Sequence, residues 1–266
     1  MKYLYLTLSS LIIAYIVLVV FIYFNQRNLL YIPSENNYQN DKIQFNYDEI
    51  FIKANDGVFL KSWIIKKDFN KFKTLVIFHG NAGHLSNRTY KLNQLYKLDI
   101  NILLISWRGF SGNKGSPTEQ NLYEDAEASI KWLNKEGVDN SRIILYGESL
   151  GSGVAVELGK KNNFNSIILE SPFTSIENSA KIYYPYLPVK LLLKDRYDSI
   201  SKIKMINTPI LIMHGEKDDV IPFSMGKELF KEANNPKHSY FTNDDDHMME
   251  FNSNLLKVIK DFIEKY

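Results

Sequence analysis

Residues 142–153 read RIILYGESLGSG and contain a serine that has a glycine two positions away on each side. Ser149 lies between Gly147 and Gly151, so the stretch fits the pattern G-x-S-x-G directly after an apolar run. A sharp turn from a strand into a helix lifts such a hydroxyl clear of the backbone, and glycines on either side prevent collisions within the turn. We therefore predict that Ser149 is the nucleophile of an acyl-transfer reaction. The alternative is a serine that only caps the following helix.

The base that would activate this serine must come from a histidine, because a serine hydroxyl is too weakly acidic to attack unaided. The chain has five histidines, and on a turn of this kind the base follows the nucleophile in the sequence. We favour His247, in FTNDDDHMMEF, because it lies in the loop after the last predicted strand. His214 ends an earlier strand and is expected to shape the next loop, whereas His238 falls within a strand, where we expect a structural role.

The acid that orients the base is left open by the residues alone. Asp218 and Asp219, in HGEKDDVIP, both follow a late predicted strand, and Glu170 ends the strand before it. Each of them could instead be a solvated loop charge or a helix cap. Residues 244–246 are also acidic, but they lie too close to His247 in the sequence to orient it easily.

An oxyanion formed during acyl transfer needs two backbone N–H donors. We expect the first from Leu150, which follows the nucleophile, and the second from the loop at residues 79–83, which reads HGNAG. Asn81 is the expected donor of that loop, and Ala82 is the alternative. The same loop could also be an ordinary glycine turn.

The elements that position these residues follow from the hydrophobic pattern. Strands are expected at residues 74–78, 100–106, 142–146, 166–169, 209–213 and 237–242, and helices at 87–98, 119–135, 149–161, 223–233 and 252–265. This alternation predicts an α/β fold with a mostly parallel central sheet and helices on both faces. Two further extended segments flank Asn55-Asp56-Gly57, which predicts an N-terminal antiparallel hairpin.

A long connection interrupts the alternation over residues 172–207 and contains IYYPYLPVKLLL. Connections of this length are often lids or binding loops. We expect a helical lid insertion whose Tyr183, Tyr184, Tyr186 and Leu187 bind an apolar substrate. The alternative is a helical pair that only packs on the core.

The N-terminus carries a candidate membrane anchor. Leu4–Phe24 contains no charged residue, and at about 1.5 Å per residue a helix of this length crosses a bilayer core of about 30 Å. A cleaved signal peptide would have a shorter apolar stretch and a small-x-small cleavage site. We therefore expect residues 1–27 to anchor one α/β domain of residues 28–266, with a polar connector near its start. Lys2 and Arg27 flank the span so evenly that they barely decide its orientation, and we favour a domain on the extracytoplasmic side.

Composition excludes several other classes of function. The net charge is only +2 and the lysines are interspersed with acids, so no nucleic-acid-binding surface is indicated. The chain has no cysteine, which excludes disulfides, cysteine nucleophiles and thiolate metal sites.

Six motifs, in this order, give the chain a family resemblance: HGNAGH, SWRGFSGNKGSPTE, YGESLGSGVAVEL, LESPFTSI, HGEKDDVIPF and DDDHMM. From about Leu29 to its C-terminus the sequence resembles the α/β-hydrolase superfamily, and within it the Bem46-like, membrane-anchored serine hydrolases. The resemblance implies the α/β-hydrolase fold, a triad of Ser149, Asp218 and His247, and no metal or organic cofactor. One departure is visible, because three acids replace the usual glycine-rich turn before the histidine. We expect these acids to raise the pKa of the imidazole or to repel anionic substrates.

The function expected from the residues and the resemblance together is a membrane-anchored serine hydrolase. It would cleave an ester, thioester or amide of a small-molecule or lipid-like acyl substrate through an acyl-enzyme intermediate, with carboxylesterase activity favoured. A peptidase or acyltransferase of the same fold, or a catalytically silent membrane-tethered scaffold, is the alternative.

Overall fold

The computed structural model describes residues 1–34 and 43–266, so half of the polar connector expected over residues 28–41 lies outside the described residues. Its main feature is an eight-stranded sheet with the strand order β10-β9-β8-β7-β4-β6-β3-β2. The strands are β2 (Asp48–Lys53), β3 (Phe59–Ile65), β4 (Thr74–Phe78), β6 (Asn101–Ile105), β7 (Ile143–Glu148), β8 (Ser166–Glu170), β9 (Ile210–Gly215) and β10 (Lys237–Thr242). The hairpin of β2 and β3 joins β6 in antiparallel fashion, and the remaining neighbours are parallel. The predicted mixed, mostly parallel sheet is thereby confirmed.

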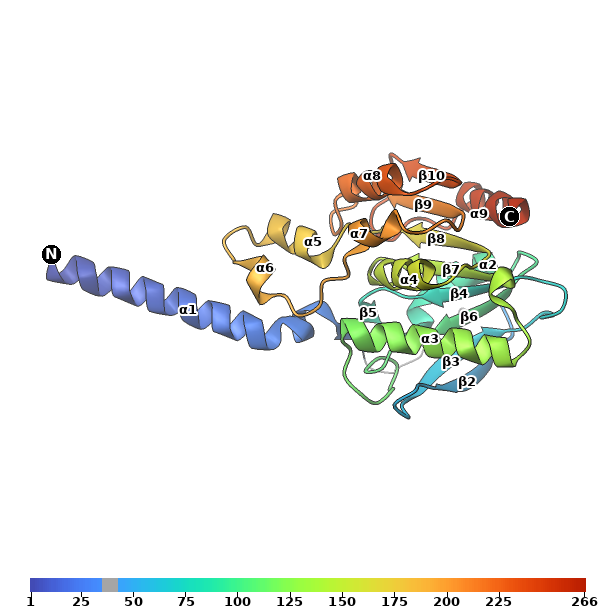
Figure 1. The fold of residues 1–266 in the computed structure, drawn as a ribbon, viewed down its shortest axis with the longest axis horizontal. Coiled ribbons are helices and arrows are strands. Elements are labelled where there is room, and N and C mark those ends of the chain that lie inside the picture. The colour runs from blue at the N-terminus through green and yellow to red at the C-terminus, as the bar shows by residue number, and fades with distance from the viewer. Residues whose placement is uncertain (35–42) are drawn as a thin grey trace.

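Helices cover both faces of the sheet and form two hydrophobic cores (Figure 1). One core includes residues of α3 (Glu119–Lys135), α4 (Leu150–Lys161) and α8 (Phe223–Glu232), and the other includes residues of α2 (Thr89–Leu95) and α9 (Ser253–Lys265). Strand β7 shows why its sequence is a continuous apolar run. Ile143 and Leu145 join the first core, whereas Ile144 and Tyr146 join the second, as the two-residue period of a strand requires.

Most predicted elements match the structure within a few residues, but two differ. The helix expected at residues 87–98 is divided into a 3-10 turn, η1 (Leu85–Arg88), and the shorter α2. The first hairpin segment, expected to be extended over residues 45–53, forms a strand only from Asp48, and the ring of Phe45 is buried in the second core. A second 3-10 turn, η2 (Asn140–Arg142), precedes β7.

The N-terminal helix α1 (Lys2–Leu30) projects from the α/β body, and its apolar length makes it a candidate membrane span (Figure 1). Just after α1, β1 (Ile32–Pro33) forms a parallel pair with β5 (Ala82–Gly83), in the loop that follows β4. The connection over residues 172–207 contains the short helices α5 (Ile176–Tyr183), α6 (Val189–Leu192) and α7 (Ser199–Ile203). We call its part from α5 through Asp195 the lid segment; it lies beside the body-proximal half of α1.

Candidate active site

Ser149 lies at the sharp turn between β7 and α4. Its backbone has φ 49° and ψ −114°, a strained conformation for a residue with a side chain. A Cβ atom on Gly151 would overlap the carbonyl oxygen of Phe78, and one on Gly147 would collide with the first turn of α4, so both flanking glycines are required. Although Ser149 occupies the N-cap position of α4, its hydroxyl makes no capping hydrogen bond and instead contacts His247.

Three side chains from separate loops form a hydrogen-bonded chain. His247 Nε2 lies 3.0 Å from Ser149 Oγ, and His247 Nδ1 lies 2.8 Å from Asp218 Oδ2. The other oxygen, Asp218 Oδ1, accepts hydrogen bonds from the backbone N–H groups of Val220 (2.9 Å) and Ile221 (2.7 Å). A carboxylate at Nδ1 fixes the proton there and leaves the lone pair of Nε2 facing the hydroxyl. This arrangement can therefore take a proton from Ser149 as the hydroxyl attacks.

The other histidines and acids that were considered as base or acid make different contacts. His214 is buried and its Nε2 lies 3.0 Å from Asp218 Oδ2, a contact that the sequence analysis did not foresee. His238 lies in β10 and its Nε2 pairs with the hydroxyl of Tyr266 at 2.8 Å, as the predicted structural role implies. The carbonyl of Asp219 accepts a hydrogen bond from Tyr183, and no described hydrogen bond joins Asp219 to a histidine.

The charge states follow from burial and from these contacts. Burial opposes ionisation of Asp218, but hydrogen bonds from His214 and His247 outweigh it and hold the pKa of the carboxyl well below its usual value. Burial likewise opposes protonation of His247. The hydrogen bond and charge of Asp218 outweigh that effect, with help from Glu170 and Glu148, so the pKa of the imidazole is raised. The site therefore favours an ionised acid beside a strengthened base.

The three acids before the base form the turn that presents it. Asp244 pairs with Lys217 at 3.1 Å, and Asp245 Oδ2 accepts a hydrogen bond from Thr242 Oγ1 at 2.8 Å. Asp246 accepts one from the backbone N–H of Met248 at 2.8 Å. The main charge effects on the imidazole come from acids outside this turn, so its acids act chiefly by shaping the loop.

A buried charge cluster around Glu148, the residue before Ser149, was missed by the sequence analysis. Glu148 Oε1 accepts a hydrogen bond from Arg88 Nη2 at 2.7 Å, and Glu148 Oε2 accepts one from Lys91 Nζ at 2.6 Å. Lys91 also pairs with Glu170, which accepts a hydrogen bond from the hydroxyl of Tyr146. Glu170, one of the acids considered as the partner of the base, therefore belongs to this cluster. The available signal was the acid next to the serine, together with two bases three residues apart in the sequence.

The loop after β4 is held from both sides. The N–H of Gly80 donates to Glu148 Oε1 at 3.2 Å, so this donor is already engaged. The side chain of Asn81 donates to the carbonyl of Leu30, the last residue of α1, at 2.7 Å. Asn81 and Leu150, the two expected oxyanion donors, line the same cavity as Ser149. Leu150 is the first residue of α4, so its N–H precedes the hydrogen bonds of the helix.

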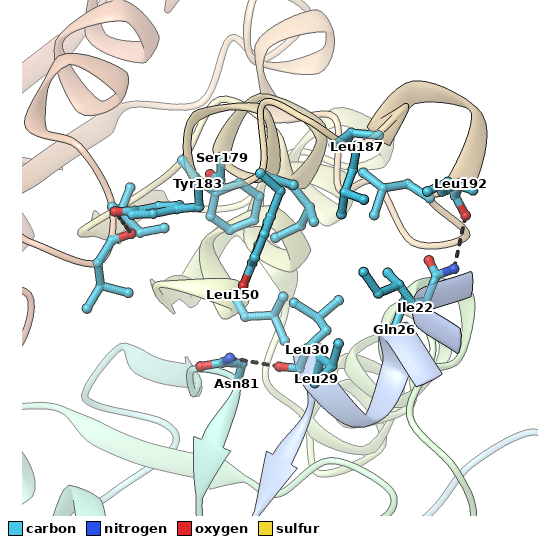
Figure 2. Close-up of a pocket in the computed structure, with 18 of the residues that line it drawn as sticks. Ile22, Gln26, Leu29, Leu30, Asn81, Leu150, Ser179, Tyr183, Leu187 and Leu192 are labelled. Carbon is cyan, nitrogen blue, oxygen red and sulfur yellow. Dashed lines mark hydrogen bonds between the residues drawn. The ribbon is translucent and has the colours of Figure 1, made fainter. Parts of the chain in front are cut away.

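An apolar cavity of about 460 Å³ opens over Ser149 between the lid segment and α1 (Figure 2). Tyr183, Tyr184 and Leu187 line it, as predicted for the lid. Tyr186, which was predicted together with them, is not part of the lining, and its side chain is exposed. Four residues of α1 also line the cavity, which the sequence analysis did not foresee: Ile22, Gln26, Leu29 and Leu30. Among the residues that the structure describes, no group of three histidine or acidic side chains could hold a metal ion.

Comparison with known proteins places this geometry in a family. Residues 70–200 match the family described as serine aminopeptidase, S33. The chain is 30% identical to the α/β hydrolase domain-containing protein WAV2 of Arabidopsis thaliana, over 78% of this chain and 75% of that protein. It is 31% identical to protein bem46 of Schizosaccharomyces pombe, over 76% of this chain and 73% of that protein.

A solved structure carries the same fold. The Pyrococcus furiosus esterase PF2001 superimposes with a TM-score of 0.73 at 19% identity, covering 89% of this chain and 96% of the esterase. Because the sequence matches to WAV2 and bem46 extend over most of both chains, and the fold agrees, the chain belongs to the α/β-hydrolase superfamily and is a Bem46-like member of it.

Proposed function

We propose that this protein is a serine hydrolase, anchored in a membrane by α1, that cleaves carboxylic esters through an acyl-enzyme intermediate. The observation that carries the proposal is the hydrogen-bonded chain from Asp218 through His247 to Ser149, with contacts of 2.8 and 3.0 Å. A buried acid, an oriented imidazole and a hydroxyl on a strained turn together are what nucleophilic acyl transfer requires.

In the first half of the reaction, Ser149 Oγ attacks the carbonyl carbon of the ester while His247 Nε2 takes the hydroxyl proton. The oxyanion that results is stabilised by the N–H groups of Leu150 and Asn81. His247 then gives its proton to the departing alcohol, and the acyl group stays on Ser149. Asp218 keeps Nδ1 protonated and stabilises the imidazolium throughout.

In the second half, water enters in place of the alcohol. His247 takes a proton from this water as it attacks the acyl carbonyl, and Ser149 leaves with that proton when the carboxylic acid is released. Both halves use the same groups, so the protein needs no further reactant than water.

The lining of the cavity favours an ester with an apolar acyl group over a peptide. The matched family is described as serine aminopeptidase, and a peptidase of that kind must bind the ammonium group of a free N-terminus. Among the described residues that line the cavity, Asp219 is the only acid, and the others are mostly aliphatic or aromatic. A site dominated by apolar groups binds an acyl chain better than it binds a charged amine.

The decisive experiment uses the full chain in detergent and a fluorophosphonate probe, together with p-nitrophenyl butyrate. Wild-type protein should be labelled and should hydrolyse the ester, and Ser149→Ala should do neither. Ser152→Ala is the matched control, because this buried serine lies one turn away in α4 and its hydroxyl has no hydrogen-bond partner. A folded wild-type protein that neither reacts with the probe nor hydrolyses esters would favour the scaffold instead.

A further inference from the structure

The helix that we propose as the anchor is also a wall of the cavity. Ile22, Gln26, Leu29 and Leu30 line it, and they are spaced by four, three and one residues, so they share one face of α1. Figure 2 shows them facing Leu187 and Leu192 of the lid segment across the cavity. The opening between α1 and the lid segment therefore starts within the last turn of the apolar span Leu4–Phe24 and leads toward Ser149.

The lid segment is joined to α1 by specific polar contacts. Gln26 makes two hydrogen bonds to the lid segment. Its Nε2 donates to the carbonyl of Leu192 at 2.9 Å, and its Oε1 accepts from the N–H of Lys194 at 2.8 Å. Arg27 pairs with the buried Asp195 at 2.8 Å. These contacts fix the lid segment against the helix at the level where the span ends.

One contact lies much farther along α1. The hydroxyl of Tyr15 donates to the carbonyl of Tyr186 at 2.7 Å. Tyr15 precedes Phe24 by nine residues, so for a helix along the bilayer normal it lies about 14 Å inside the apolar span. The tip of the lid segment would then lie deep within the same leaflet, since half of the hydrocarbon core is about 15 Å thick.

The surface of the lid segment suits this position. Among its exposed side chains are the apolar or aromatic ones of Ile182, Tyr184, Tyr186 and Leu191, the last of them 83% exposed. At the level where the span ends, the ammonium of Lys194 stands 4.2 Å from the ring centre of Tyr23. Exposed apolar and aromatic side chains on this segment, with Lys194 beside Tyr23 at the end of the span, suit contact with the hydrocarbon and interface of a leaflet.

We infer that the substrate is an acyl ester lipid of the surrounding leaflet, which enters the cavity sideways between α1 and the lid segment, with α1 as part of the acyl-binding site. This inference rests on the proposed function. Leu30 lies six residues, or about 9 Å, beyond the span, so Asn81 and Ser149 stand near the outer limit of the headgroup layer. An acyl chain held along α1 would bridge the hydrocarbon region and the nucleophile.

The first test changes the α1 wall of the cavity and compares two substrates in phosphatidylcholine vesicles that contain the full chain. Ile22→Trp should lower the hydrolysis of monooleoylglycerol by about tenfold or more, because a misfit in an apolar pocket has effects of this size. The hydrolysis of p-nitrophenyl acetate, which needs no acyl channel, should stay within about twofold of wild type. Val20→Trp is the matched control, because this exposed residue lies on another face of the same helix turn and should alter neither rate.

The outcomes separate the inference from the proposed function. If Ile22→Trp left the lipid reaction unchanged, or lowered both reactions equally, the inference would be overturned while the esterase proposal stood. If wild-type protein hydrolysed neither substrate and resisted the fluorophosphonate probe, the proposed function itself would fail.

A second test reads the position of the lid segment without any activity. In vesicles whose acyl chains carry bromine, the fluorescence that Tyr186→Trp adds to that of wild type should be strongly quenched. Wild-type protein is the control, because its three tryptophans, Trp63, Trp107 and Trp132, all lie in the α/β body. Unquenched emission from the added tryptophan would show that the lid tip lies in water and would overturn lateral entry, whatever the hydrolysis assays give.

Discussion

Replacing Asp218 by asparagine should disable the base without removing it. The two backbone N–H groups that bind Asp218 Oδ1, at 2.7 and 2.9 Å, will also require an oxygen from the amide, so its NH2 group must take the place of Oδ2. That position faces His247 Nδ1 at 2.8 Å and His214 Nε2 at 3.0 Å. Because an amide NH2 group can only donate, Nδ1 of the base must become the acceptor. The proton then moves to Nε2, which can no longer take one from Ser149.

The size of the effect follows from the lost charge. At an effective dielectric constant of 20, unit charges 2.8 Å apart attract by about 6 kcal/mol, and here this attraction exists only once the imidazolium forms. Since about 1.4 kcal/mol corresponds to a factor of ten, Asp218→Asn should lower kcat for p-nitrophenyl butyrate by about 10⁴-fold.

The assay compares kcat of the variant with that of wild type and of Asp244→Asn. Asp244 is the matched control because its side chain is 95% exposed and pairs only with Lys217 among the described contacts, so its removal should leave kcat within about twofold. A thermal unfolding curve verifies that Asp218→Asn is folded. A loss of less than about 100-fold in a folded variant would refute the argument that Asp218 sets the tautomer and charge of the base.

Three further predictions concern the surroundings of the site. With His247 as the base, kcat/KM requires its neutral imidazole, and because the pKa of this imidazole is raised, kcat/KM should fall on acidification from above pH 6.5. Glu170→Gln removes a charge that raises this pKa and should move the acidic limb of the pH–kcat/KM profile to lower pH. Lys91→Met leaves Glu148 and Glu170 buried without their shared cation and should cost about 3–5 kcal/mol of unfolding free energy, measured by denaturant titration. Gly151→Ala should yield no stable folded protein by circular dichroism, because its methyl group would overlap the backbone of β4.

The fold could be predicted because the sequence repeats a simple pattern at every strand. The strands β4, β6, β7 and β8 are buried on both faces and therefore read as unbroken apolar runs. The order of the motifs then places Ser149 after β7, the acid after β9 and the base after β10, at one edge of a parallel sheet. Their close approach follows from this topology, and their catalytic roles remain predictions.

The parts that could not be predicted depend on contacts between distant segments. Arg88 and Lys91 look like ordinary helix-surface charges, and only the fold reveals that they point inward to Glu148. The contact of His214 with Asp218 depends on how the chain folds back after β9. The sequence of α1 does not indicate which of its faces contacts the lid segment, because a helix that is apolar on all sides has no polar face to show which side is exposed.

The pairing of β1 with β5 gives α1 a second consequence for anyone who wishes to purify this protein without detergent. Deleting residues 1–33, a common way to obtain a crystallisable protein, would also remove the main-chain partner of Ala82 and Gly83 and the carbonyl of Leu30 that binds the side chain of Asn81. The shortened protein would retain Ser149 yet have lost the contacts that hold the loop at residues 79–83, where we expect the second oxyanion donor. Kinetic constants measured on it would therefore describe a different catalyst from the one that the cell contains.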